Sequence, residues 1–232
     1  MKLYSYIVAR DFGFAPNPFH GLCTLATCKP QIRARASVGD WIIGTGAKSR
    51  YRFNGRLIYA MRVGEVLDFD RYWNDPRFIR KRPDLNGSLK VIYGDNIYRR
   101  EGKRWVQTDS HHSLEDGRQN EANIARDTSV DRLLIGTKFV YLGKDAPLIP
   151  KRFRPFRKTN KDICCKARGY QVFEEDLAID FVNWLEQQGK WGFQGDPLEF
   201  ERHRRTSPLK AKNGTPTANR TAKHRSAQRT AK

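Results

Sequence analysis

The chain has 232 residues and a net charge of +19, with 44 Lys and Arg against 25 Asp and Glu. Residues 201–232 carry +9 of this charge and residues 1–200 the remaining +10, so the basic excess is not confined to one end. Such a charge favours a polyanionic partner, and nucleic acid, with DNA preferred to RNA, is the simplest one. There is no apolar run long enough to cross a membrane and no apolar leader, so we expect a cytoplasmic protein without a membrane partner.

In the first half of the chain, alternating apolar and polar residues predict strands at 3–9, 22–27, 41–45 and 56–66. Lys29-Pro30 begins a short helix, because proline is tolerated in a first helical turn. Residues 68–73 predict another short helix with Asp68 as its N-cap. Residues 75–86 are basic and have no clear period.

The second half opens with a hairpin of strands 96–100 and 104–108 around the turn Glu101-Gly102-Lys103. Residues 114–131 are polar and predict a surface loop or short helix. Residues 133–142 read as the last clear strand. A proline-bearing basic segment follows, and apolar residues spaced by four predict an amphipathic helix near residues 174–189. Residues 201–232 lack apolar periodicity, and we expect them to be disordered.

These elements predict one α+β domain over residues 1–200. It comprises a β-rich core (1–143), a basic wrap (144–173) and a docked helix (174–189), followed by the basic tail (201–232).

The segment Asp109-Ser110-His111-His112-Ser113 follows the second hairpin strand and contains no apolar residue, so a packed core does not explain it. If the segment is extended, the two histidines point in opposite directions and only one of them faces a given pocket. His111 or His112 is a candidate acid or base, with Asp109 orienting it and Ser113 beside it. No Ser/His/Asp triad has a diagnostic spacing.

The loop at residues 10–21 is the candidate second wall of a pocket. A phenylalanine such as Phe14 offers a surface for stacking on a base, and the loop also supplies polar groups. The hairpin region adds groups that could read a base edge. Among them, Asp95 and Asn96 could equally shape a turn. The candidate nucleotide-binding residues are therefore Arg10, Asp11, Phe14, Asn17, His20, Asp95, Asn96, Tyr98 and Ser113.

Contacts to a nucleic-acid backbone are expected from basic residues on the short helix near residue 30 and on the loop at 46–54: Arg33, Arg35, Lys48, Arg50 and Arg52. Cys23, Cys28, Cys164 and Cys165 match no zinc-ribbon or zinc-finger spacing, so we expect reduced thiols, no metal and no cofactor. Zinc bound by Cys23, Cys28 and a histidine is the open alternative. Cys23 lies in a predicted strand and is interpreted as a small core residue.

Four segments together resemble the nucleotide-modification-associated domain 2 family: YSYIVARDFGFAPNPFHGLCTLATCKP, VGDWIIGTG, YGDNIYR and QTDSHHS. The resemblance covers residues 1–200 and implies an association with phage or bacterial DNA-modification systems, without implying a reaction. The order of the short helix, the Val38-Gly39-Asp40 turn and the two following strands also resembles the PUA-like domains, including EVE and ASCH. That likeness implies a mixed β-barrel with a pocket for a nucleotide or modified base.

Two functions follow as hypotheses. The first is a protein that binds nucleic acid or a modified nucleotide in DNA base modification. The second is an enzyme that processes a nucleotide or DNA base with a histidine acid or base. The chain lacks a phosphate-binding glycine loop, a Rossmann fingerprint and a deaminase pattern, so sequence alone favours binding. A scaffold that only recruits proteins would explain the tail but not the polar hairpin.

Overall fold

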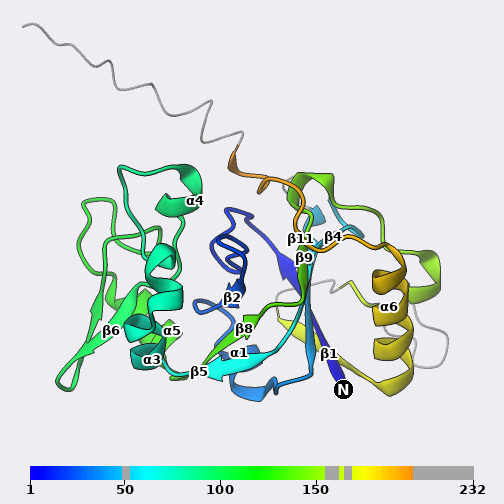
Figure 1. Ribbon diagram of the computed structural model, residues 1–232, viewed down its shortest axis with the longest axis horizontal. Coiled ribbons are helices and arrows are strands. Elements are labelled where there is room, and N and C mark those ends of the chain that lie inside the picture. The colour runs from blue at the N-terminus through cyan, green and yellow to red at the C-terminus, as the bar shows by residue number, and fades with distance from the viewer. Residues whose placement is uncertain (49–52, 155–161, 165–168, 201–232) are drawn as a thin grey trace, which may run out of the picture.

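The computed structural model describes residues 1–48, 53–154, 162–164 and 169–200. This part of the chain is a mixed α+β structure with one six-stranded sheet, one three-stranded sheet, a two-stranded hairpin and several short helices (Figure 1). The predicted α+β class with short helices is confirmed. The expected tail at 201–232 lies outside the described residues. None of the described helices has the length and apolarity that crossing a membrane would require.

The six-stranded sheet has the order β10-β1-β3-β4-β9-β11. Two pairs of neighbours, β1 with β3 and β9 with β11, are parallel, and the other pairs are antiparallel. The strands are β1 (Lys2–Val8), β3 (Trp41–Gly46), β4 (Leu57–Arg62), β9 (Phe139–Tyr141), β10 (Tyr170–Glu174) and β11 (Gly192–Phe193).

The described strands do not close into a barrel, so the expected PUA-like barrel is wrong. A barrel needs every strand to have two neighbours. Here β10 pairs with β1 and β11 pairs with β9, and these two strands form the open edges of the sheet. Neither edge strand was predicted, because each is short and lies in a segment without clear alternation.

A second sheet arises because two long predicted strands bend. The run 56–66 divides into β4 and β5 (Glu65–Leu67), and the run 133–142 divides into β8 (Leu133–Gly136) and β9. β8 pairs with β5 and with β2 (Cys23–Leu25). At the bend, a Cβ on Gly136 would lie 2.6 Å from the carbonyl oxygen of Arg62, so only glycine allows the two backbones to approach.

The remaining elements are short and lie between the strands. Asp68 caps its helix as predicted, its side chain accepting a hydrogen bond from the Arg71 backbone N–H at 2.7 Å. These elements are α1 (Pro30–Arg35), α3 (Phe69–Asn74), the 3₁₀ helix η1 (Pro76–Lys81), α4 (Leu89–Ile92), α5 (Glu121–Thr128), the 3₁₀ helices η2 (Gly143–Asp145) and η3 (Lys151–Phe153), and α6 (Glu175–Gln187).

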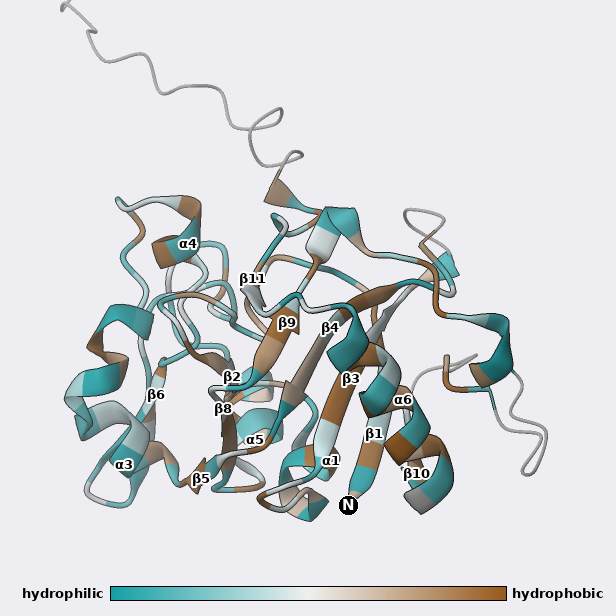
Figure 2. Ribbon diagram, turned by 45° about the vertical axis from the view of Figure 1, so that its right-hand side comes forward, coloured by the Kyte–Doolittle hydropathy of each residue, from teal (hydrophilic) through white to brown (hydrophobic). Residues whose placement is uncertain are grey.

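Helix α6 packs beside the six-stranded sheet, on the side away from the three-stranded sheet (Figure 1). Leu177, Phe181 and Leu185, spaced by four, are all buried and belong to the same core as β1 and β3. Figure 2 shows the apolar residues concentrated in the central strands and polar residues on the outer side of the helix. The amphipathic pattern therefore acts by burying one stripe of the helix.

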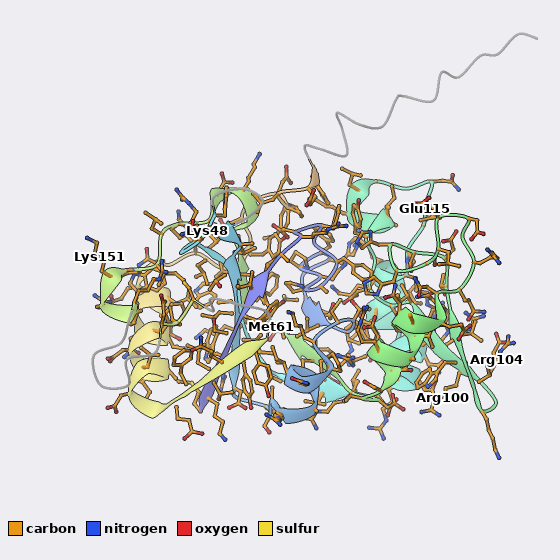
Figure 3. All side chains as sticks on the ribbon, turned by 180° about the vertical axis from the view of Figure 1, so that it is seen from behind. Lys48, Met61, Arg100, Arg104, Glu115 and Lys151 are labelled. Atoms are coloured by element: carbon orange, nitrogen blue, oxygen red, sulfur yellow. The ribbon has the colours of Figure 1, made fainter. Side chains whose placement is uncertain are left out.

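The hairpin of β6 (Tyr98–Glu101) and β7 (Arg104–Gln107) lies at the opposite end of the molecule from α6 (Figure 1). Arg104 extends outward from it, while Lys48 and Lys151 lie at the far end (Figure 3). After β7 the chain forms a turn in which Ser113 N–H donates to the carbonyl of Ser110 at 3.0 Å. His111 and His112 are in this turn and not in an extended segment, so their expected opposite orientation is wrong.

Candidate functional site

Three residues that are far apart in the sequence meet near the end of β2. Cys28 follows β2 and precedes α1, His112 lies in the turn after β7, and Asp127 lies on α5. The Nδ1 atom of His112 is 2.9 Å from Oδ2 of Asp127, and its Nε2 atom is 3.7 Å from Sγ of Cys28. One imidazole thus joins a carboxylate to a thiol, which is the arrangement of a Cys–His–Asp nucleophilic site.

Asp127 is fully buried, and in the described part of the chain four donors contact its carboxylate. Oδ2 accepts from His112 and from the Tyr98 hydroxyl at 2.9 Å. Oδ1 accepts from the backbone N–H of Cys28 and from Nε of Arg126, each at 3.1 Å. Burial alone would raise the pKa of Asp127, but the hydrogen bond and charge of His112 outweigh it and the pKa is lowered.

His112 is held from both its ring and its backbone. Its side chain is 12 % exposed, and its carbonyl accepts from the side-chain amides of Gln107 at 3.3 Å and Asn123 at 2.7 Å. Burial lowers the pKa of the ring, but the hydrogen bonds to Asp127 and Cys28 oppose this and raise it to about 9. At neutral pH the ring is therefore an imidazolium beside the Cys28 sulfur.

Arg33 ties the Cys28 turn to α5 from inside the protein. Its Nε donates to the Cys28 carbonyl at 2.9 Å, and its guanidinium also donates to the carbonyls of Asp127, Val130 and Arg132. The side chain is fully buried, so it does not reach the phosphates that were predicted for it. Arg33 instead fixes the distance between the thiol and the carboxylate.

The backbone at Cys28 is unusual for a residue with a side chain. Cys28 has φ 57° and the next residue, Lys29, has φ 43°, both in the left-handed region that non-glycine residues avoid. The thiol is half-buried at this strand-to-helix turn. A nucleophile on a strained turn between a strand and a helix is a recurring way to present a reactive side chain.

Aromatic rings form a wall beside the histidines. The Phe14 ring centroid lies 4.5 Å from that of His112 and 5.2 Å from that of His111. Phe12 lies 4.4 Å from His111 and stacks on Tyr93 at 5.0 Å. His111 reaches solvent, yet its packing against these rings, together with the charges of His112 and Arg10, lowers its pKa to about 4. His111 is therefore neutral near pH 7 and extends the wall.

The same three residues are also the kinds that bind a metal ion, since one ligand atom from each lies within 4.8 Å of the others. The donor set fits a metal poorly as it stands. Both oxygens of Asp127 already accept hydrogen bonds, and a metal would have to displace at least one donor from a fully buried carboxylate. The geometry more closely matches the thiol, imidazole and orienting carboxylate of a Cys–His–Asp site.

Most of the other predicted loop residues serve the structure. Asp11 is buried and accepts from the Tyr141 hydroxyl and from Leu198 N–H. Asn17 is fully buried, donates to the Tyr93 carbonyl at 2.8 Å and accepts from Lys81 Nζ at 2.7 Å.

Asp95 and Asn96 are likewise inside the core, so neither reads a base in this structure. Asp95 accepts from the Thr24 hydroxyl at 2.6 Å and the Tyr72 hydroxyl at 2.8 Å. Asn96 donates to the carbonyls of Tyr72 and Phe78. Their polar pattern holds the loop before β6 in place.

The remaining predicted residues are scattered. Asp109 is exposed, and the carboxylate that contacts the His112 ring belongs to Asp127. The Ser113 hydroxyl accepts a hydrogen bond from Ser110 N–H within the turn. Arg35 is exposed beside Tyr170, and Lys48 is exposed. His20 lies in a separate pocket. Arg50 and Arg52 lie outside the described residues. Of the predicted set, His112, His111, Phe14, Tyr98 and Arg10 come together.

Sequence reasoning did not bring Cys28 and Asp127 together with His112 as one site. One signal for Cys28 was its place between a strand and a helix. For Asp127 the signal was its spacing from Ile124, because the two residues share the buried face of α5. An acid on the buried face of a helix requires partners. The hydroxyl of Tyr98 and the ring of His112 supply them.

A family model described as nucleotide modification associated domain 2 matches residues 1–204. The chain belongs to this family. The resemblance inferred from the four sequence segments is thereby confirmed, and the family name associates the chain with nucleotide modification. The match includes all three residues of the Cys28–His112–Asp127 site. No curated protein and no solved structure matches the chain significantly.

Proposed function

We propose that this member of the nucleotide modification associated domain 2 family is an enzyme that acts on a nucleotide or on a DNA base through Cys28. One observation carries the proposal: a single imidazole, that of His112, contacts both the Cys28 thiol and the buried Asp127 carboxylate. A protein that only binds a base has no need of this arrangement. The geometry thus favours the enzymatic hypothesis over the binding one.

The residues have distinct roles in the proposed reaction. In the ion-pair form of a Cys–His site the proton resides on the imidazole and the sulfur is a thiolate. The sulfur electron pair forms a bond to an electrophilic carbon of the substrate, and a π electron pair of the substrate moves to a nitrogen or oxygen atom. His112 gives that atom its proton, and Asp127 keeps the imidazole oriented and stabilises its charged form.

The surroundings support a flat, anionic substrate. Phe12 and the exposed, neutral His111 give an aromatic surface next to His112, on which a base can stack, and the buried Phe14 supports it from inside. The basic charge of residues 1–200 attracts phosphate groups. DNA and free nucleotides both meet these requirements.

The test is turnover of DNA and of deoxynucleotides by the purified protein, followed by mass spectrometry of the nucleosides. Cys28→Ser and His112→Ala are expected to abolish conversion while the proteins stay folded. His111→Ala and Cys164→Ser are matched controls: the first weakens substrate binding but keeps the chemistry, and the second changes neither. Conversion by Cys28→Ser at the parent rate would refute the proposal.

A further inference from the structure

A pocket of about 220 Å³ is lined by residues of α4, of β11 and of the loop at 10–22. It is assembled from four parts of the chain: that loop, α4, the turn between β8 and β9, and β11. Its lining includes Phe19, His20, Lys90, Thr137 and Phe193. None of the residues of the Cys28 site lines it.

His20 is the unusual residue of this pocket. Its backbone has φ 62°, and within the described part of the chain its Nε2 atom is buried without a hydrogen-bond partner. Burial, followed by the charges of Arg80, Lys81 and Lys90, lowers its pKa. A buried ring nitrogen without a partner is costly, and a bound group that forms a hydrogen bond with it removes the cost.

The charges around the pocket favour an anion. Lys90 is exposed at its rim, and among the described residues that line the pocket none is acidic. Arg80 and Lys81 add their positive charges near His20. Thr137, exposed in the turn between β8 and β9, adds a hydroxyl that can donate to an oxyanion.

An aromatic ring, that of Phe193, lies next to the Lys90 ammonium group. The half-buried Phe193 ring stacks on Tyr141 at 5.7 Å with the planes 12° apart, and it lies 5.5 Å from Phe19, so its position is fixed. Lys90 Nζ is 4.5 Å from the Phe193 ring centroid. A fixed ring with an ammonium group at this distance suits a ligand with a flat ring and an anionic group close together.

We propose that this pocket binds a nucleoside monophosphate unit, with its phosphate between Lys90 and His20 and its base against Phe193. The proposal goes beyond the enzymatic function, because the pocket shares no residue with the Cys28 site. The unit is either a free nucleotide or one residue of a single strand, since both present the same phosphate and base.

Calorimetric titration of the full chain tests this. The probes are the four deoxynucleoside 5′-monophosphates, inorganic phosphate, deoxynucleosides and short oligothymidylates. Lys90→Ala is expected to weaken binding of the monophosphates or oligomers by about tenfold. Phe193→Leu is expected to weaken the binding of nucleotides but not that of inorganic phosphate. His20→Asn is expected to weaken the binding of all phosphate-bearing probes, and Asn tolerates the positive φ at this position.

Lys151→Ala is the matched control, because this exposed lysine lies at the far end of the molecule (Figure 3). It is expected to bind like the parent. Cys28→Ser separates the two sites: the part of the binding that Lys90→Ala removes is expected to persist in Cys28→Ser, even if the Cys28 site proves inactive. The proposal is overturned if no phosphate-bearing probe binds the parent. It is equally overturned if Lys90→Ala and Lys151→Ala weaken binding to the same extent, or if only Cys28→Ser weakens it.

Discussion

The Nδ1 atom of His112 lies 2.9 Å from Oδ2 of Asp127, although the two residues come from a turn and a helix fifteen positions apart. The carboxylate of this contact is fully buried, and the imidazole is only slightly exposed. It raises the pKa of His112, lowers that of Asp127, and turns the other ring nitrogen toward Cys28. The proposed chemistry depends on this pair.

The pair predicts a specific dependence of stability on pH. The folded pKa of His112, about 9, is above its unfolded value of roughly 6.5, so the stabilisation is complete below pH 6.5 and is lost as pH rises through 9. Chemical denaturation of the parent and of His112→Gln between pH 6 and pH 10 measures it. The difference in unfolding free energy should shrink on the order of 2–3 kcal/mol across this range.

His111 makes a contribution of the opposite sign, and it changes below the pH range of that experiment. Its pKa is lowered to about 4, so its neutral form contributes to stability above pH 6.5 and the contribution is lost as pH falls toward 4.

For His112, a difference in unfolding free energy between the parent and His112→Gln that stays constant from pH 6 to pH 10 would show that the ion pair with Asp127 does not form.

Replacement of Asp127 by Asn should release the proton from His112. Asn keeps the size of the side chain but removes the charge that raises the pKa. In a proton NMR titration of the histidine ring signals, the His112 pKa should fall by at least about one unit. Asp109→Asn is the control, because Asp109 is exposed and a different carboxylate contacts His112. Equal effects of the two substitutions would contradict this assignment.

Arg33 should be essential for the fold around the site. Replacing it with Ala leaves the carbonyls of Cys28, Asp127, Val130 and Arg132 without this donor, at a cost we expect to exceed about 3 kcal/mol. Arg35, on the same helix, is exposed, and Arg35→Ala should cost less than about 1 kcal/mol. Urea denaturation distinguishes the two; similar losses would mean that the Arg33 contacts contribute little.

The basic residues at 201–232 should contribute to nucleic-acid affinity through charge alone. They carry +9, and removing them reduces the number of counterions released on binding DNA. Deletion after Phe200 should therefore weaken DNA binding and make the plot of log affinity against log salt less steep. A salt slope identical to that of the full chain would show that these residues do not contact the DNA.

The strands and short helices were predictable where local pattern determines them. The alternation of residues 3–9, the turn at Gly102 and the cap at Asp68 are local features, and all three occur in the structure. The closure of the sheet is a property of distant pairings. The bends at Gly64 and Thr137 divide two predicted strands between two sheets. They depend on how these strands pair with each other, and the alternation of apolar and polar residues does not change at either bend.

The site was predictable only in part for the same reason. The polar turn drew attention to His111 and His112 because no core could explain it. Its nucleophile and carboxylate lie elsewhere in the sequence, and adjacency suggested Asp109 in place of Asp127. Buried polar residues such as Asn17, Asp95 and Arg33 look like binding groups in a sequence, although in the structure they hydrogen-bond inside the protein.

The most direct test of the central claim is the reactivity of the Cys28 thiol. The full chain is treated with iodoacetamide at pH 7, and peptide mass spectrometry follows the alkylation of each cysteine over time, with and without a chelator. We predict that Cys28 reacts faster than the buried Cys23 and Cys164, and that His112→Gln slows it by about tenfold without slowing the others. Equal rates for Cys28 in the parent and in His112→Gln, or reaction only after chelation, would contradict the account of Cys28 as a nucleophile activated by His112.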